Sequence, residues 1–388
     1  MFARRTNWEL SENPLSLALA QRRAGGKRVL DLTESNPTTV GINYPSEILL
    51  GEFKDRNNLI YAPEAAGLLR TRTAVSEYFA VRGTVVPPEH ITLTASTSEA
   101  YSFLFRLLAD PGDKILLPAP SYPLFSYLAG LNDVEPVYYQ LDFDGALWRI
   151  DFDSMERAAK AGGVKAVILV SPNNPTGSFI LPDELLRLNA LCARRGLAII
   201  SDEVFSDYLF GDACGQYTSL ASNPAVLSFA LGGLSKALAL PQMKLGWIAA
   251  NGPESLLKDA LVRLEVICDT YLSVNTPVQN ACVRWLAQSQ LIQAEVLRRA
   301  QENLSFVTQE AEKAGIFIYP VSGGWSAILR PELNAGEDEW AVRLLEETGV
   351  NVHPGFYFDF AVDGHIVLSL LPRPEVFCEG IRRIMAFQ

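Results

Sequence analysis

Histidine, cysteine and long apolar runs are all scarce in this chain, and each shortage narrows its possible functions. Its 388 residues include 3 histidines and 5 cysteines. His90, His353 and His365 lie far apart in the sequence, so their spacing gives no indication of a metal site. The cysteines are odd in number and lack the C-x-x-C spacing of zinc and redox motifs, so we expect free thiols in a reducing cytoplasm.

Positive charge is outnumbered by negative charge. The chain has 33 lysines and arginines against 44 acidic residues, which gives a net charge of -11 at pH 7. This balance argues against nucleic acid or an anionic membrane as the main partner. No uninterrupted apolar run is long enough to span a bilayer, and the opening M-F-A-R-R-T-N-W-E-L has no apolar signal core after its arginines.

Apolar sequence, in contrast, is abundant and arranged in alternating segments. Hydrophobic residues make up 48% of the chain, enough for two domains or one large core. From residue 90 to residue 201, strand patterns alternate with segments of helical length, and runs such as A-V-I-L-V are apolar throughout. This alternation predicts an α/β fold, a three-layer sandwich whose mostly parallel central sheet is covered by helices on both faces.

The pattern changes after Trp247. Long helical patterns cover residues 254–288 and 290–314, and short strands and a final helix follow. We therefore expect a large domain over residues 41–275 and a smaller α+β domain built from residues 1–40 and 276–388. Before the alternating region, residues 65–82 have a helical pattern and residues 41–62 are rich in turn residues.

One lysine stands out in the stretch from Leu227 to Trp247, which reads L-S-F-A-L-G-G-L-S-K-A-L-A-L-P-Q-M-K-L-G-W. Lys236 follows an apolar strand and two glycines, in otherwise uncharged surroundings. Burial disfavours the charged form of a lysine, and an amine forced toward neutrality is a nucleophile for aldehydes. A solvated lysine at the rim of a loop fits the local sequence too, so the rest of the chain has to decide.

Two upstream stretches carry polar residues where a predicted strand ends. T-A-S-T-S-E-A, residues 94–100, leads into a helix, and Ser96 with Glu99 matches a capping box. A simple helix cap explains this stretch, but the free amides and hydroxyls of a helix start also suit a phosphate. P-A-P-S-Y-P, residues 118–123, places Tyr122 where it could stack on a flat ring or fill a turn.

Two further stretches follow buried strands. S-P-N-N-P-T-G, residues 171–177, forms a rigid polar loop at the carboxyl end of the A-V-I-L-V strand, where ligands bind in open α/β sheets. S-D-E-V-F, residues 201–205, puts Asp202 at a strand end. A buried carboxylate there needs a partner, and a protonated pyridine nitrogen would be one.

Taken together and in order, these motifs resemble those of the class I/II aminotransferases, the fold-type I pyridoxal-phosphate enzymes. The markers are N-P-T-G, the strand-end D-E, S-K, and a basic residue before L-G-W. The resemblance covers nearly the whole chain. It implies a transaminase that uses pyridoxal 5'-phosphate to move an amino group between an α-amino acid and a 2-oxo acid. It also implies a homodimer with shared active sites, and cis peptide bonds before Pro120 and Pro175.

The resemblance implies a role for each matching residue around the cofactor ring. Lys236 corresponds to the lysine that forms the aldimine, a Schiff base, and that moves a proton between Cα and C4′. Asp202 corresponds to the partner of the pyridinium nitrogen, whose protonation lets the ring accept electrons. Asn174 would hydrogen-bond the ring O3′ and help hold the substrate carboxylate, and Tyr122 would stack on the ring.

A second group matches the phosphate and substrate contacts of the family. The phosphate-binding set comprises Ser96, Thr97, Ser98, Ser235 and Lys244. Tyr61 matches a tyrosine that reaches the phosphate from the other subunit. Asn36, in E-S-N-P-T, falls where the N-terminal segment of the family closes over the substrate.

The chain also departs from the family pattern. Phe205 stands where a tyrosine usually hydrogen-bonds O3′, and Lys244 replaces the usual phosphate arginine, giving a point charge in place of a bidentate fork. In the late strand H-I-V-L-S-L, Ser369 puts Val367 at the position of the arginine that binds the substrate carboxylate. Arg373 is the nearest candidate for that role, and an exposed arginine beside the last helix is the alternative interpretation.

Two other functions are compatible with the same cofactor and fold. A lyase would carry out β-elimination, and the choice of reaction depends on which substrate bond stands perpendicular to the ring. A sensor module would bind the cofactor without turnover, as in regulators where this fold follows a DNA-binding domain; the acidic charge argues against it.

Overall fold

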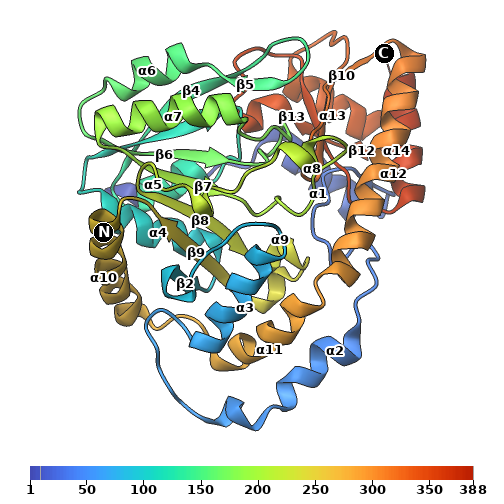
Figure 1. Ribbon diagram of the computed structural model, residues 1–388. Coiled ribbons are helices and arrows are strands. Elements are labelled where there is room, and N and C mark those ends of the chain that lie inside the picture. Colours follow the sequence, from blue (N-terminus) through green and yellow to red (C-terminus); the bar gives the residue numbers. More distant parts are fainter. Residues whose placement is uncertain (9, 388) are drawn as a thin grey trace.

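The computed structural model describes residues 1–8 and 10–387. It contains a large unit built on an eight-stranded sheet and a smaller unit with a four-stranded sheet and a two-stranded pair (Figure 1). The predicted α/β class is therefore confirmed. No helix in the described ranges is both long enough and apolar enough to cross a membrane.

The large sheet supplies the frame of the molecule. Its strands, in order across the sheet, are β2 (Ile91–Thr94), β9 (Gly246–Asn251), β8 (Ser228–Gly233), β7 (Ala198–Asp202), β6 (Val164–Val170), β3 (Lys114–Ala119), β4 (Glu135–Phe143) and β5 (Trp148–Ile150). The β8–β7, β7–β6, β6–β3 and β3–β4 ladders are parallel, whereas β9 and β5 run opposite to their neighbours. The sheet is mostly parallel, as predicted.

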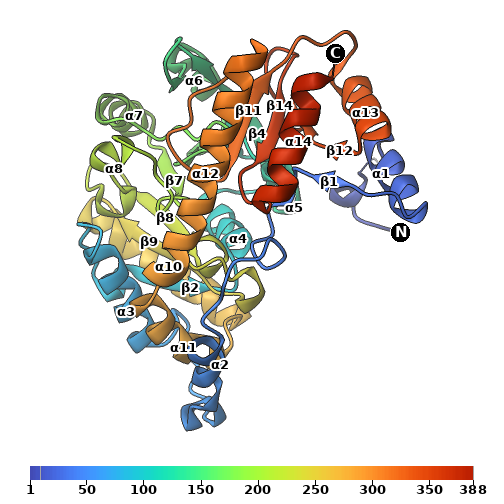
Figure 2. The ribbon, with the colours of Figure 1, turned by 90° about the vertical axis from the view of Figure 1, so that its right-hand side faces the viewer.

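Helices cover both faces of this sheet (Figures 1 and 2). They are α3 (Leu69–Ala80), α4 (Thr97–Leu108), α5 (Phe125–Leu131), α6 (Phe152–Ala159), α7 (Pro182–Arg195), α8 (Ala213–Gln216), α9 (Leu234–Ala237), α10 (Glu254–Tyr271) and α11 (Thr276–Ala287). In β6, Ile168 belongs to the apolar cluster of α4, whereas its neighbours Val167 and Leu169 belong to that of α7. Burial on both faces explains why this strand is apolar throughout.

The smaller unit combines the two ends of the chain. Its elements are α1 (Pro14–Ala24), β1 (Leu30–Asp31), α12 (Gln290–Ala314), β10 (Phe317–Ile318), β11 (Ser326–Arg330), α13 (Glu337–Thr348), β12 (Val350–Asn351), β13 (His353–Pro354), β14 (Ile366–Ser369) and α14 (Pro374–Ala386). β1 pairs in parallel with β12, so the N-terminal segment lies beside the C-terminal one. Helix α11 packs against α3 of the large unit, and the domain boundary at residue 275 stays a prediction.

Two predicted helices differ from the observed ones. The pattern over residues 65–82 gives a helix only from Leu69 to Ala80, because Gly67 holds a φ of +89° and packs closely on Leu93. The pattern over residues 254–288 gives two helices, because the chain turns at Leu272, which has a φ of 45°. The amino-acid sequence gives no indication that a residue with a side chain will adopt this left-handed conformation.

Some local features were predicted from the sequence, and others were not. The turn-rich residues 41–62 contain α2 (Ser46–Gly51). The peptide bonds before Pro120 and Pro175 are cis, as predicted, and the bond before Pro172 is also cis. Short 3-10 helices occur at Arg4–Thr6, Glu52–Lys54, Arg56–Leu59, Pro88–His90, Leu220–Ser222, Pro241–Met243 and Gly355–Phe358.

Candidate active site

The ends of four parallel strands place the predicted site at one edge of the large sheet. β3 ends at Ala119, β6 at Val170, β7 at Asp202 and β8 at Gly233. Parallel strands bring their carboxyl ends to the same edge, which is where open α/β sheets bind ligands. The segments that follow these strands carry Tyr122, Asn174, Asp202, Phe205, Ser235 and Lys236.

Lys236 lies in the single helical turn α9, directly after β8. Its side-chain nitrogen Nζ lies 4.9 Å from the ring centre of Trp325 and 5.6 Å from that of Phe205. Burial lowers the pKa of this amine, and the negative charge of Asp202 partly offsets the effect. The amine therefore loses its proton more readily than an ordinary lysine, as the sequence indicated.

Asp202 is buried at the end of β7. Its Oδ2 accepts a hydrogen bond from the Tyr101 hydroxyl at 3.0 Å, and its Oδ1 accepts one from the backbone N–H of Val204 at 3.2 Å. Burial nevertheless raises the pKa of Asp202 to about 6, against the opposing effects of those two bonds and of Lys236. A further positive group beside this carboxylate would therefore be stabilised.

The start of helix α4 is capped as predicted, with one difference. The Ser96 hydroxyl accepts a hydrogen bond from the Glu99 N–H at 3.1 Å, as in a capping box. The Glu99 carboxylate bonds the N–H of Ala95 at 2.7 Å, one residue before the expected partner. Thr97 and Ser98 form the first turn, where helix amides have no partner within the helix.

The other predicted phosphate contacts lie on exposed or half-buried segments. Ser235 is half-buried next to Lys236 in α9. Lys244 is exposed and has a φ of 51°, so the turn before β9 holds it in the left-handed region. Tyr61 is 78% exposed, on a segment where its neighbours Leu59 and Ile60 are also exposed.

Asn174 and Tyr122 have different environments. The Asn174 Oδ1 accepts a hydrogen bond from the Ser326 hydroxyl at 3.1 Å, which links the loop after β6 to strand β11 of the smaller unit. Tyr122 is 42% exposed and packs edge-to-face on Phe125. Burial raises the pKa of the Tyr122 hydroxyl, and the negative charge of Asp202 adds to the shift.

The predicted substrate contacts are the least tightly held. Asn36 is exposed, and its Oδ1 accepts hydrogen bonds from the Thr38 N–H and hydroxyl at 3.1 and 2.7 Å. Arg373 is exposed at the start of α14, and a Cβ built on Gly41 would lie 3.0 Å from its Nε. Val367 is 2% exposed, so its side chain belongs to the packed core.

Sequence reasoning missed two residues of this site. Tyr101 donates to Asp202 from the second turn of α4, and Trp325 places its ring beside Lys236 from the loop before β11. The buried Nε1 of Trp325 has no hydrogen-bond partner among the described residues. The first contact depends on how α4 lies over the sheet, and the second depends on how the smaller unit packs. Neither can therefore be predicted from the neighbouring sequence.

This set of side chains fits pyridoxal 5'-phosphate. An amine of lowered basicity suits an aldehyde, and the first turn of α4 with its hydroxyls suits a phosphate. The raised pKa of Asp202 is the most specific observation, because a buried carboxylate with that pKa lacks a strong cationic partner. A protonated ring nitrogen would supply one.

Comparisons with known proteins bear on the family and the fold of this chain. A family model described as aminotransferase class I and II matches residues 27–376. The glutamate-pyruvate aminotransferase AlaA of Escherichia coli (strain K12) is 30% identical over 258 residues, which are 66% of this chain and 63% of that protein. The chain thus matches less than two thirds of the length of that relative. The AlaA protein of Haemophilus influenzae is 28% identical over 376 residues, 93% of this chain and 91% of that protein.

A solved structure shows the same fold. The alanine aminotransferase from Pyrococcus furiosus superposes with a TM-score of 0.89 and 24% identity, over 100% of this chain and 99% of that chain. At this level of identity the likeness concerns the fold. It agrees with the arrangement of large sheet and smaller unit described above.

Proposed function

This chain belongs to the aminotransferase class I and II family, and from that premise we propose that it is a pyridoxal-phosphate-dependent transaminase. It moves an amino group between an α-amino acid and a 2-oxo acid. The observation that carries the proposal is the pair formed by Lys236 and Asp202. Burial shifts their pKa values in opposite directions, up for Asp202 and down for Lys236, and outweighs the mutual attraction of the two charges.

Bound pyridoxal phosphate supplies an aldehyde that condenses with amines and a protonated ring that withdraws electrons from the substrate Cα. The residues of this chain would hold it and direct it. Asp202 would keep a proton on the ring nitrogen, and Lys236 would provide an amine that can accept and return a proton. Tyr122 would stack on the ring and Asn174 would hydrogen-bond its O3′, whereas Phe205 has no hydroxyl to donate there.

The phosphate is held, in our proposal, by the start of α4 together with Ser235 and Lys244. The dipole and free amides of the helix favour a dianion there, and Ser96, Thr97 and Ser98 add hydroxyl donors. Lys244 adds a positive charge without fixing direction, since an ammonium group has no planar fork.

We propose further that two copies of the chain form a homodimer with shared active sites. The exposure of Leu59, Ile60 and Tyr61 supports this, because neighbouring apolar side chains on one exposed segment are typical of interaction surfaces. Tyr61 of the partner subunit would complete the phosphate site.

A cytoplasmic location is also proposed. The thiols of Cys192, Cys268 and Cys282 are free and buried. Burial raises the pKa of the first two to about 12, so these thiols stay protonated and unreactive. Buried, unpaired thiols agree with a reducing compartment.

The names of the relatives indicate the first substrates to test, which are alanine or glutamate as donor and pyruvate or 2-oxoglutarate as acceptor. We expect the cofactor absorbance to change when donor alone is added and to return when the 2-oxo acid follows. Release of pyruvate and ammonia from a single β-substituted amino acid, without an acceptor, would favour the lyase instead. No absorbance change with any amino acid donor would contradict both reactions.

A further inference from the structure

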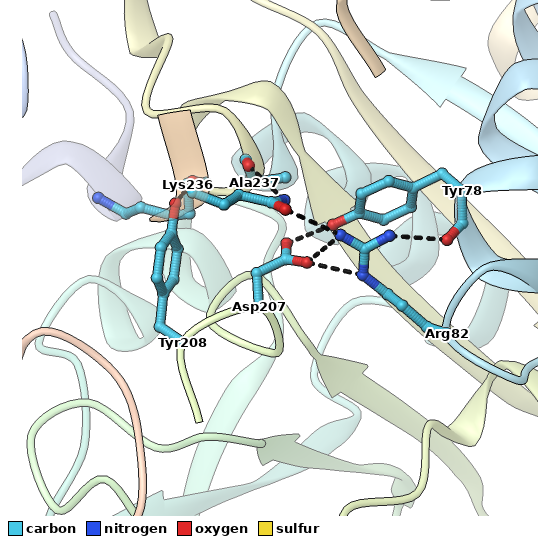
Figure 3. A network of polar contacts seen from close by, with 7 residues as sticks. Tyr78, Arg82, Asp207, Tyr208, Lys236 and Ala237 are labelled. Atoms are coloured by element: carbon cyan, nitrogen blue, oxygen red, sulfur yellow. Dashed lines mark hydrogen bonds and ion pairs between the residues drawn. The ribbon is translucent and has the colours of Figure 1, made fainter. Parts of the chain in front are cut away.

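Two side-chain donors bond backbone carbonyls of the turn that carries Lys236, and Figure 3 shows one of them, Tyr208, beside that turn. The Tyr208 hydroxyl donates to the Lys236 carbonyl at 2.7 Å, and the Gln293 side-chain amide donates to the Ala237 carbonyl at 2.8 Å. Helix α9 has four residues, and the last carbonyls of a helix have no partner within it. The Lys236 carbonyl also accepts the Ala239 N–H at 3.0 Å, so Tyr208 adds a second bond there, whereas Gln293 supplies the partner of the Ala237 carbonyl.

The turn needs such fixing because its backbone is strained. Two residues after the helix, Ala239 has a φ of 52°, which is uncommon for a residue with a side chain. Its carbonyl accepts a further hydrogen bond from the Tyr44 hydroxyl at 2.7 Å. Conformations of this kind persist only where surrounding contacts over-determine them.

Gln293 is itself held by an ion pair. Arg82 donates through Nε to the Asp207 carboxylate at 2.7 Å and through Nη2 to the Gln293 Oε1 at 3.3 Å. That bond fixes the amide so that its N–H₂ end faces Ala237. The Tyr78 hydroxyl also bonds Asp207, and the Arg82 guanidinium lies 3.6 Å from the centre of the Tyr78 ring.

The residues that follow Lys236 in the turn are buried, whereas the ion pair and Gln293 that support it border a cavity. Tyr78, Arg82, Asp207 and Gln293 all line a cavity of about 560 Å³. The Asp207 side chain is only 3% exposed, so its pairing with Arg82 is shielded from water more than an ordinary surface pair.

We propose that Tyr208 and Gln293, the latter fixed by the Arg82–Asp207 pair, are positioning residues that hold Lys236 beside the rings of Phe205 and Trp325. The proposal rests on the proposed function in giving Lys236 its role. Loosening the turn would expose the amine to water and move it from Asp202, the charged group that faces it. Burial lowers the amine pKa more than Asp202 raises it, so loosening returns the pKa toward its higher ordinary value.

The test uses Tyr208→Phe, which removes only the hydroxyl, and Gln293→Leu. Tyr139→Phe is the matched control, because the buried Tyr139 hydroxyl also bonds a backbone carbonyl, that of Ile168 at 2.8 Å, outside this turn. Acetic anhydride labelling of cofactor-free protein across pH, read by peptide mass spectrometry, gives the pKa of Lys236. We expect a rise of half a unit or more in both variants, a threefold loss of free amine near pH 8, and no rise in Tyr139→Phe.

Arg82→Lys serves as a milder variant, with a smaller rise expected because lysine keeps the charge but loses the fork. Circular dichroism identifies any variant that fails to fold. The proposal is then judged on the Lys236 pKa of the variants that do fold. An unchanged Lys236 pKa in the folded variants overturns the positioning role, as does an equal rise in Tyr139→Phe. Failure of the proposed function has a separate sign, which is wild-type protein that never attaches pyridoxal phosphate at Lys236.

Discussion

At the scale of single residues, the buried carboxylate of Asp202 lowers the stability of the folded protein while serving its proposed catalytic role. Burial raises the pKa of its carboxyl from 3.8 to about 6. The folded state then binds the proton more tightly than the unfolded state, so stability falls as the pH rises from about 4 to about 6. A shift of this size corresponds to a cost of about 3 kcal/mol above that range.

We predict that Asp202→Asn, freed of cofactor, is more stable than the wild type at pH 8 by up to about 3 kcal/mol. The difference should shrink as the pH falls through about 6 and vanish below about 4, where the Asp202 carboxyl of the wild type is protonated in both the folded and the unfolded state. Urea unfolding at the two pH values measures this. The variant should also lose most transamination, a barrier increase of about 3 kcal/mol or more. Near-normal turnover would show that Asp202 has another role.

Arg373 is the candidate residue for binding the substrate carboxylate. It lies beside Gly41 at the start of α14, while Val367 is buried and uncharged. Arg373→Ala should lower kcat/KM for the best amino donor tenfold or more, since a charge-assisted bond contributes about 1.5–3 kcal/mol. Arg195→Ala, at the exposed end of α7, is the control. An unchanged value for Arg373→Ala would assign the carboxylate to Asn36, Asn174 and backbone amides.

At the scale of elements, the start of α4 combines a helix cap with the proposed phosphate site. Ser96→Ala removes the cap and should cost about 1 kcal/mol of stability. It should also weaken pyridoxal phosphate binding several-fold. Asp151→Ala removes the cap of α6, which accepts bonds from Asp153 and Ser154, and should cost similar stability without changing cofactor affinity. Equal cofactor affinity in the two variants would mean that Ser96 is only a cap.

Element boundaries followed from sequence where local chemistry decided them. Residues 290–314 form a helix with the predicted bounds, and the residue that follows it is Gly315, which has a positive φ. The break at Leu272 has no such glycine, because a residue with a side chain takes the left-handed conformation there. The same limit applies to the site: strand ends predicted Asp202, but its bond from Tyr101 depends on how α4 lies over the sheet.

At the scale of the whole molecule, shared active sites make a prediction about mixed dimers. Tyr61→Ala and Lys236→Ala should each be nearly inactive as homodimers. A mixed dimer would combine one intact Lys236 with the intact Tyr61 of the partner subunit, giving one complete site. Random exchange of subunits should therefore restore about a quarter of wild-type activity. No recovery in a preparation shown by sedimentation to contain dimers would place Tyr61 and Lys236 in the same subunit's site.

The central claim is that Lys236 holds the cofactor. Borohydride reduction of the protein after incubation with pyridoxal phosphate, followed by peptide mass spectrometry, tests it most directly. We predict a yellow protein that loses its colour on reduction and a cofactor mass on the peptide containing Lys236. Lys244→Ala should keep that label, whereas Lys236→Ala should lose it. A colourless protein whose Lys236 peptide stays unlabelled would contradict the account.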